Sequence, residues 1–280
     1  MQRFTLSLTL EILMAILTVL VLTRADGTSL YPLRDLAYHL DKKKGDNILV
    51  LGEDQKLYHQ QVKAALSLIG FNAPRAVHYS FVLLQEGKMS TRKGNVVLLS
   101  DFMQEAFDKA KKEIKKRHGS FVEVNAKKIA YGAIKYAILK VSNEKNVVFD
   151  WEQALNFEGD SGPYLQYAYA RISSIIEKFG GKISKEVDYS LLKEEQEVAL
   201  IKMIGDFPSI VKEASEQLKP NLIANYLYNL SAEFSTFYNA CPVLQAEEET
   251  KKARLVLVDS VRKVLKNGLS LLGIEVLEKM

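Results

Sequence analysis

The sequence predicts an incomplete α/β sheet followed by a helical bundle. Two short, nearly continuous apolar runs, Leu17–Leu22 and Ile48–Leu51, each end at a turn residue, as buried strands of a parallel sheet do. Beyond Asp101, apolar residues recur at helical spacing for most of the remaining length. A chain of 280 residues has room for two domains of ordinary size, and we place their boundary near residue 125.

Strand and helix patterns alternate in the first part of the chain. Helical patterns follow the two apolar runs, at Leu33–Lys43 and at Lys56–Ile69, and the second pattern stops at Gly70. An extended segment, Ala76–Leu84, then leads into the polar loop Gln85–Asn95. We therefore expect strand, helix, strand, helix and a further strand before this loop.

The second part of the chain is predicted to be helical. Apolar side chains repeat on one helical face in Ala126–Val141, in Leu222–Tyr238 and in Arg254–Leu272, and the last of these stops at Gly273. The sequence contains no internal repeat and no low-complexity segment.

Composition narrows the class of protein. Hydrophobic residues make up 48% and charged residues 26%, which is typical of a globular chain. A single cysteine, Cys241, excludes a disulfide framework and indicates a reducing, cytoplasmic setting. Four scattered histidines show no ligand spacing, so we assign no protein-bound metal. The net charge of +4 is compatible with a polyanionic partner only if the basic residues cluster, as they do in Lys109–Arg117.

Residues 1–16 form an apolar leader whose role the sequence leaves open. Apolar residues dominate from Phe4 to Leu22 behind Arg3, as in a signal peptide or membrane anchor. Glu11 in the middle of this run argues against a membrane segment. The alternative is an unusual N-terminus, or a shortened gene whose new start exposes sequence that is buried in a longer protein.

The polar loop carries the first candidate site residues, Lys88, Ser90, Arg92 and Lys93, next to Gly94. A basic loop of this kind is most often solvated surface. The functional alternative is a clamp in which ammonium and hydroxyl groups hold the phosphates of ATP and offset charge that develops on them.

The order of residues in this loop resembles the Lys-Met-Ser-Lys-Ser loop of class I aminoacyl-tRNA synthetases. Read as KMSTRKGN, it is similar to the loop of arginyl-tRNA synthetases in particular. Other segments that resemble this family are Asp26–Ala37 (DGTxxYxxRDxA), Gly52–Gln55, Phe149–Trp151, Ser161–Arg171 and the ending Asn267–Met280. The resemblance runs in order from about residue 17 to residue 280.

The resemblance implies a fold and an activity. Residues 17–125 would be the second half of the Rossmann-like parallel sheet of a class I synthetase, and residues 126–280 a helical anticodon-binding domain. The implied reaction is the ATP-dependent activation of arginine and its attachment to tRNA(Arg), with Mg²⁺ accompanying ATP.

By the same resemblance Tyr31, Asp35 and Gln55 are the candidates that hold arginine. Tyr31 and Asp35 are four residues apart and share a helix face, where a carboxylate can take a guanidinium in forked hydrogen bonds. On the residues alone, an internal ion pair of Asp35 with Arg34 or Lys42 is the simpler interpretation.

The resemblance further implies that Tyr164, Ala168, Tyr238 and Met280 meet the anticodon loop of tRNA, and that Tyr167 packs inward. Without it, the tyrosines after Gly162 would be assigned to the core. The basic stretch Lys109–Arg117 fits phosphate contacts and a plain solvated helix face equally well.

One motif of class I synthetases is absent from this sequence, namely His-x-Gly-His. Three hypotheses follow. The chain is half of an arginine–tRNA ligase that works with a separate N-terminal synthetase fragment, or it is a non-catalytic tRNA-binding module, or it is the remnant of a split gene.

Overall fold

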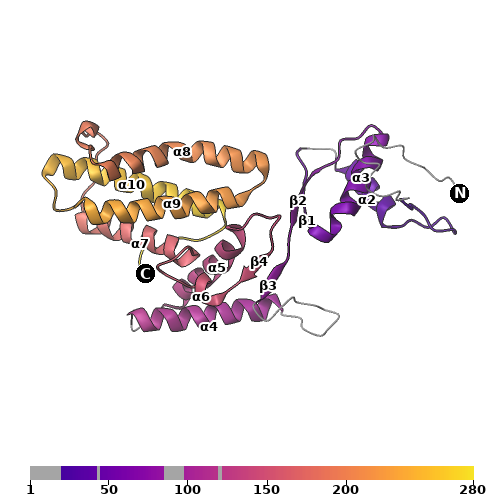
Figure 1. Cartoon of the computed structure of the whole chain (residues 1–280), viewed down its shortest axis with the longest axis horizontal. Coiled ribbons are helices and arrows are strands. Elements are labelled where there is room, and N and C mark those ends of the chain that lie inside the picture. The colour runs from indigo at the N-terminus through magenta and orange to yellow at the C-terminus, as the bar shows by residue number, and fades with distance from the viewer. Residues whose placement is uncertain (1–19, 43–44, 85–97, 119–121) are drawn as a thin grey trace. The chain divides into compact units, whose positions relative to one another are not determined.

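The structure is a computed structural model that describes residues 20–42, 45–84, 98–118 and 122–280. These residues belong to two compact units, Met1–Ser80 and Phe81–Met280 (Figure 1). Each unit has a small sheet and a buried core of its own. No helix in the described ranges is both long and apolar enough to cross a membrane. The leader, residues 1–16, lies outside these ranges.

The first unit contains the predicted parallel sheet with a helix before it and a helix inside its crossover. Its elements are α2 (Tyr31–Asp41), β1 (Ile48–Gly52), the 3-10 turn η1 (Glu53–Gln55), α3 (Lys56–Leu68) and β2 (Arg75–Tyr79). The strands β1 and β2 pair in parallel, in a register that runs from Ile48 opposite Arg75 to Gly52 opposite Tyr79. The predicted α/β arrangement is confirmed.

The strand predicted at Leu17–Leu22 is not found in its described part. Residues 20–22 lie in no strand, and the chain makes only an isolated antiparallel bridge between Thr23 and Ser29. The turn between them is held by Asp26, whose carboxylate accepts hydrogen bonds from the backbone and the hydroxyl of Thr28 at 2.9 and 2.6 Å. An apolar run favours burial, but it does not by itself supply a neighbouring strand.

The core of the first unit is small. Leu36 of α2 packs against Val62 and Leu66 of α3, with Phe71 at its edge. Helix α3 ends where Gly70 adopts a positive φ of 73°, which lets the amide of Phe71 return to the carbonyl of Leu66 at 2.9 Å. The predicted helix stop at Gly70 is therefore confirmed.

The second unit is mainly helical. Its elements are β3 (Val82–Leu84), α4 (Leu99–His118), α5 (Glu123–Leu139), β4 (Val147–Phe149), α6 (Trp151–Ala154), α7 (Gly162–Phe179), η3 (Tyr189–Leu191), α8 (Glu195–Gln217), α9 (Pro220–Ala240) and α10 (Glu248–Leu271). The three helices predicted from periodicity correspond to α5, α9 and α10.

The single extended segment predicted at Ala76–Leu84 is divided between two sheets. Its first part is β2, which pairs with β1, and its last part is β3, which pairs in parallel with β4. The change of partner occurs at Phe81, whose amide donates to the Asn146 side chain at 3.1 Å. Strand pairing depends on residues distant in sequence, so the break is not visible in the local pattern.

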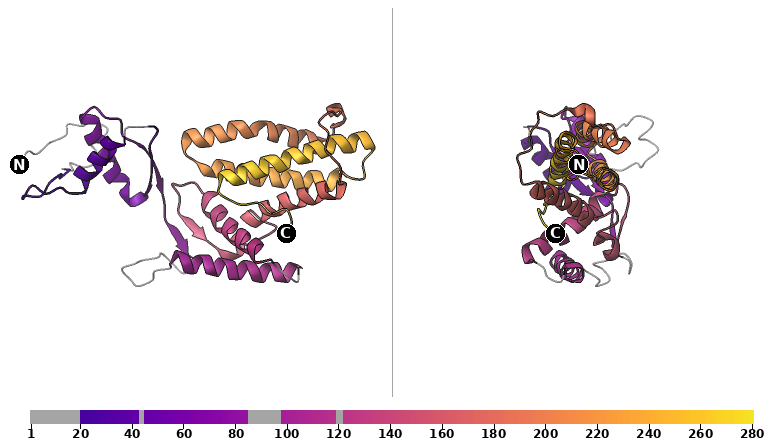
Figure 2. Two further views of the ribbon diagram at one scale, coloured as in Figure 1. Left: turned by 180° about the vertical axis from the view of Figure 1, so that it is seen from behind. Right: turned by 90° about the vertical axis from the view of Figure 1, so that its left-hand side faces the viewer.

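Two buried clusters stabilise the second unit. In one, α7, α8, α9 and α10 lie side by side as a bundle around fully buried residues such as Leu227, Phe234 and Leu265 (Figure 2). In the other, α4 packs on α5 through alanine-rich faces, next to the rings of Phe102 and Trp151. Residue 125, near which we predicted the domain boundary, lies in the first turn of α5, and the boundary stays a prediction.

A buried ion pair joins three parts of the bundle. Glu197, in the first turn of α8, is fully buried; one carboxylate oxygen caps the amide of Glu194 at 2.9 Å and the other accepts from Arg254 Nε of α10 at 2.7 Å. Arg254 also donates to the carbonyl of Pro242 at 2.8 Å. Because all these groups are partnered, the pair is tolerated inside the protein, but neither charge can be left alone there.

We expect Arg254→Ala to lower the free energy of unfolding by about 3–5 kcal/mol, because it leaves the Glu197 carboxylate buried without its counter-ion. Lys252→Ala, which removes an exposed ion pair two residues earlier, is the control and should change stability little. Urea unfolding followed by circular dichroism measures both. An Arg254→Ala variant as stable as the control would contradict this account.

Candidate functional site

Two predicted arginine-binding residues lie at the start of α2. The Tyr31 side chain is 76% exposed, and Asp35, one turn later, is half-buried. Asp35 Oδ2 accepts a hydrogen bond of 2.5 Å from the hydroxyl of Tyr58, which belongs to α3. Burial, together with this bond, raises the pKa of the Tyr58 hydroxyl, so Tyr58 remains a donor at neutral pH.

The simpler interpretation of Asp35, an internal ion pair, does not hold among the described residues. Arg34 Nε donates instead to Ser29 Oγ at 3.0 Å, and the Lys42 ammonium lies over the Tyr38 ring at 4.5 Å. No basic side chain in the described ranges forms a salt bridge with Asp35. Among the described residues, the Asp35 carboxylate is therefore held by a neutral donor and by no cation.

Gln55 ends the turn η1, directly after the carboxyl end of β1. Its side chain is exposed and donates to the neighbouring Asp54 at 3.2 Å. Ligands of open parallel sheets bind beyond the carboxyl ends of the strands. Gln55 lies at that edge, and Tyr58 follows in the first turn of α3, so one helix start carries both Gln55 and the group that holds Asp35.

The remaining residues predicted for catalysis, Lys88, Ser90, Arg92 and Lys93, lie outside the described residues. Their role as a clamp for ATP phosphates stays a prediction.

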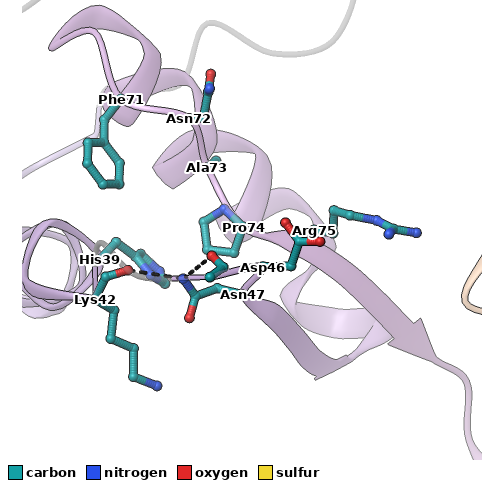
Figure 3. A pocket seen from close by; sticks show the side chains of 10 residues that line it. His39, Lys42, Asp46, Asn47, Phe71, Asn72, Ala73, Pro74 and Arg75 are labelled. Carbon is teal, nitrogen blue, oxygen red and sulfur yellow. Dashed lines mark hydrogen bonds between the residues drawn. The ribbon is translucent and has the colours of Figure 1, made fainter. Parts of the chain in front are cut away.

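A pocket of about 150 Å³ lies at the opposite edge of this sheet (Figure 3). Its walls come from the end of α2 and from the segments that precede β1 and β2, and they are formed by His39, Lys42, Gly45, Asp46, Asn47, Phe71, Asn72, Ala73, Pro74 and Arg75. Asn47 shapes its floor by donating to the Lys42 carbonyl at 3.0 Å. The pocket faces the amino ends of the strands, so it is separate from the edge where Gln55 lies.

In the first unit, the pKa of His59 is affected by two other histidines. The rings of His59 in α3 and His78 in β2 lie 5.4 Å apart, and the Nε2 atoms of both are buried without a hydrogen-bond partner. Burial is the main cause that lowers the pKa of His59, and the nearby His78 lowers it further. Lys63 and His39 add smaller decreases to the same pKa. Burial likewise lowers the pKa of His39. The imidazoles of His39 and His59 are therefore neutral at pH 7.

The predicted anticodon residues Tyr164 and Tyr238 both lie where α7 meets α9. The Tyr164 hydroxyl is 3.4 Å from Ser235 Oγ of α9, and its ring lies 5.8 Å from that of Tyr228. Ala168, by contrast, is 4% exposed and belongs to the core, which leaves its methyl group almost no surface to offer a ligand.

Arg171 forms a stack with two of the tyrosines, an arrangement that the sequence did not predict. Its guanidinium lies 4.7 Å from the ring centroid of Tyr167 and 5.4 Å from that of Tyr238. Tyr167 is thus half-buried against Arg171 instead of packing inward, and Tyr169 is the tyrosine of this segment that is fully buried. The Tyr238 side chain remains 41% exposed beside the cation.

Met280 lies elsewhere in the second unit. Its half-buried side chain packs against the cluster formed by α4, α5 and Leu277. The structure thus groups Tyr164, Arg171 and Tyr238 along α7 and α9, and it places Met280 at the end of a segment that packs separately.

Two further sequence interpretations concern charge and thiol chemistry. In the basic stretch of α4, Lys109 pairs with Glu105 at 3.5 Å and Arg117 with Glu113 at 2.8 Å, which neutralises part of the charge. Cys241 is buried, and burial raises the pKa of its thiol, as expected for a structural cysteine. The described part of the chain contains no group of three side chains placed to hold a metal ion.

Comparison with known proteins gives two family matches. The family described as "tRNA synthetases class I (R), catalytic domain" matches residues 8–151, and the "DALR anticodon binding domain" matches residues 165–280. The first match alone covers more than half of the 280 residues. The chain belongs to the arginyl-tRNA synthetase family.

Individual members of the arginyl-tRNA synthetase family are similar over nearly the whole chain. The arginine–tRNA ligase of Methanocella arvoryzae is 48% identical over 267 residues, which are 93% of this chain and 47% of that protein. The ligase of Methanocaldococcus jannaschii is 46% identical over 91% of this chain and 46% of its own length. The chain therefore spans about half the length of these curated relatives.

A solved arginyl-tRNA synthetase, that of Thermus thermophilus, has the same fold. It matches with a TM-score of 0.85 and 31% sequence identity, over 95% of this chain and 52% of the solved one. Within the two family matches, Asp35, Gln55 and Tyr58 lie in the catalytic part, and Arg171, Tyr238 and Met280 lie in the anticodon-binding part.

The histidine cluster of this synthetase chain predicts a pH effect. The unfolded chain binds protons near pH 6.5, whereas His39 and His59 have lower pKa values in the folded protein. Between the two pKa values the unfolded state binds more protons, so the stability of the first unit rises with pH and is lost as pH falls below about 6.5.

Hydrogen exchange of α3 peptides, corrected for the intrinsic rate, measures this effect. His59→Gln should weaken the pH dependence, and the control His118→Gln, in α4 of the second unit, should leave it unchanged. Equal pH dependence in the parent and in His59→Gln would contradict the assignment.

Proposed function

We propose that this chain supplies the arginine site, the ATP loop and the tRNA-binding bundle of an arginine–tRNA ligase, and that catalysis needs a complementing segment that carries the rest of the sheet. The observation that carries the proposal is that one face of the two-stranded sheet in the first unit is exposed. Parallel sheets are covered on both faces, yet Val50 of β1 is 67% exposed and Ile48 on the same face is exposed too.

The length of the relatives supports a complementing segment. Since the chain spans about half of them, the remaining half is available to add strands and to supply the missing His-x-Gly-His motif. This segment is either part of the same polypeptide or a separate N-terminal synthetase fragment. In this proposal residues 17–125 complete the catalytic domain and residues 126–280 form the anticodon-binding domain, in a protein of the cytoplasm.

The arginine site follows from the Asp35 carboxylate. A guanidinium binds a carboxylate through two parallel charge-assisted hydrogen bonds, which need a fixed carboxylate plane. The bond from Tyr58 fixes that plane without neutralising the charge. Tyr31, exposed one turn earlier, and Gln55, after the carboxyl end of β1, are proposed to contact the rest of the amino acid.

The loop that contains Lys88, Ser90, Arg92 and Lys93 is proposed to bind ATP with its Mg²⁺ ion. In the first step the arginine carboxylate attacks the α-phosphate and pyrophosphate leaves. The cationic side chains of the loop would offset charge on the departing phosphates, a contribution that is greatest in the transition state.

The tRNA site is proposed to lie where α7 meets α9. Unpaired bases of RNA loops stack on aromatic rings and on guanidinium planes. Arg171 holds the rings of Tyr167 and Tyr238 in one stack, and the exposed part of Tyr238 is free to extend that stack with a base. Ala168 and Met280 remain proposed contacts from the family resemblance.

Pyrophosphate exchange tests the catalytic half of the proposal. We expect no arginine-dependent exchange by this chain alone, even with tRNA(Arg) present, and exchange when the N-terminal half of the Methanocella arvoryzae relative is added. In the reconstituted enzyme Asp35→Asn should raise the KM for arginine roughly ten-fold or more, because it removes a charged acceptor. Lys88→Ala should mainly lower kcat.

The matched control for Asp35→Asn is Asp41→Asn, which changes an exposed carboxylate at the end of the same helix. Robust exchange by the isolated chain would overturn the need for a complement. Failure of the mixture to exchange, with intact tRNA binding, would favour a non-catalytic tRNA-binding module.

Base stacking predicts the effect of two substitutions on tRNA binding. Stacking on an aromatic ring contributes about 1–3 kcal/mol, so Tyr238→Ala and Arg171→Ala should each weaken binding of tRNA(Arg) about ten-fold. The loss should be smaller for a copy with an altered anticodon. Tyr189→Ala, at another exposed tyrosine, is the control. If both substitutions weaken the two tRNAs equally, the surface does not read bases.

A further inference from the structure

The C-terminal tail, residues 274–280, has a fixed place without regular structure. It contains no helix or strand, yet Ile274 and Leu277 are buried. A segment without a backbone ladder needs other partners for its polar groups. The position of its last residue, Met280, therefore depends on the few contacts that hold the tail backbone.

One of these contacts comes from Gln166 in the second turn of α7. The Gln166 side chain is fully buried, and its Nε2 donates to the Glu275 carbonyl of the tail at 2.8 Å and to the Lys128 carbonyl of α5 at 3.1 Å. Both partners are acceptors, and the two hydrogens of the amide NH₂ group satisfy them together without adding a buried charge. A carboxylate of the same shape would face two carbonyl oxygens with no hydrogen to share.

Gly132 makes room for this amide. A Cβ atom at position 132 would lie 2.8 Å from Gln166 Nε2 and 3.0 Å from its Oε1. Because Gly132 is one helical turn after Lys128, the missing side chain opens the path by which the amide reaches the Lys128 carbonyl. Gly132 thus leaves the space in which the Gln166 side chain connects α7 to α5 and to the tail.

The other side-chain contacts of the tail are one part-buried hydrogen bond and two ion pairs with exposed carboxylates. The Tyr169 hydroxyl donates to the Glu278 carboxylate at 2.9 Å, which holds a side chain of the tail and not its backbone. Lys128 Nζ pairs with the Glu275 carboxylate at 2.9 Å, and Lys279 pairs with Glu177 at 2.6 Å. Exposed ion pairs contribute little, whereas a buried donor or carbonyl that loses its partner is costly. Among the described contacts, the Gln166 amide is the buried side-chain group that binds the tail backbone directly.

We propose that Gln166 is a positioning residue for tRNA recognition, which fixes the tail backbone at Glu275 and thereby sets the position from which Met280 meets the anticodon loop. The proposal rests on the proposed function for the role of Met280, but the docking of the tail does not. Gln166 itself is buried and does not touch the tRNA.

Hydrogen exchange in the full chain tests the docking. In the Gln166→Glu variant, amides of the tail should exchange roughly ten-fold faster, while peptides of α9 keep the parent rate. Gly132→Ala should have the same effect through displacement of the amide. Lys279→Ala, which removes only an exposed ion pair, should leave tail exchange near the parent rate. Unchanged exchange in Gln166→Glu would overturn the proposal.

Discrimination between tRNAs tests the consequence. The measured quantity is the ratio of Kd values for an anticodon-altered tRNA and for tRNA(Arg). Gln166→Glu should lower this ratio about ten-fold, as should deletion of Met280 alone, and the two changes combined should lower it no further. If the combined change lowers the ratio no more than either single change, the two changes act on the same contact. A general loss of stability would not produce this result.

The outcomes separate this proposal from the proposed function. If deletion of Met280 lowers the ratio but Gln166→Glu does not, Gln166 is only structural and the positioning role is wrong. If the parent chain shows no discrimination at all, the proposed anticodon site fails, and with it the tRNA role of Gln166, although exchange still reports the docking of the tail.

Discussion

The close crossing of α5 and α7 is the constraint on which the second unit depends. A Cβ atom on Gly162 would lie 2.4 Å from the Gly132 carbonyl oxygen, so no side chain fits between the two helices at this point. Contact at this distance fixes where the start of α7 crosses α5. The helix then presents Tyr164 and Arg171 toward α9, and it directs Gln166 into the interior.

The two units differ in how far they support their own sites. The second unit has two large buried clusters behind its proposed tRNA surface. The buried ion pair of Glu197 and Arg254 further joins α8 to α10 in its bundle. The described core of the first unit rests on Leu36, Val62 and Leu66. A site on so small a core becomes rigid only when more apolar surface of its unit is buried. This is the physical reason for proposing that a complementing segment covers the sheet.

The sequence predicted those parts of the fold that are fixed by local pattern. The helical repeat in Leu222–Tyr238 is visible because it persists over several turns, and α9 extends it by two residues at each end. A proline would be expected to end a helix, but Pro208 lies inside α8, which packs along α9 and accepts a hydrogen bond of 2.8 Å at the Met203 carbonyl from the Tyr226 hydroxyl. Packing against another helix leaves no local sign in the sequence.

The candidate site shows the same division. The family resemblance pointed to Tyr31, Asp35 and Tyr238 as site residues. In the structure Tyr31 and Tyr238 are exposed, and the Asp35 carboxylate accepts a hydrogen bond from one neutral donor, Tyr58. The partners Tyr58 and Arg171 were not predicted, because each acts through a residue distant in sequence: Tyr58 on Asp35 and Arg171 on Tyr238. Distances of this kind are set by packing and cannot be read from spacing.

The central proposal is that this chain carries a specific anticodon reader on α7 and α9. Nuclease protection of tRNA(Arg) by the full chain tests it most directly. We expect protection of the anticodon-loop nucleotides, and loss of that protection in Gly162→Ala, which forces α5 and α7 apart. Protection spread evenly over the whole tRNA, and unchanged in that variant, would contradict the claim and leave only a generic basic surface.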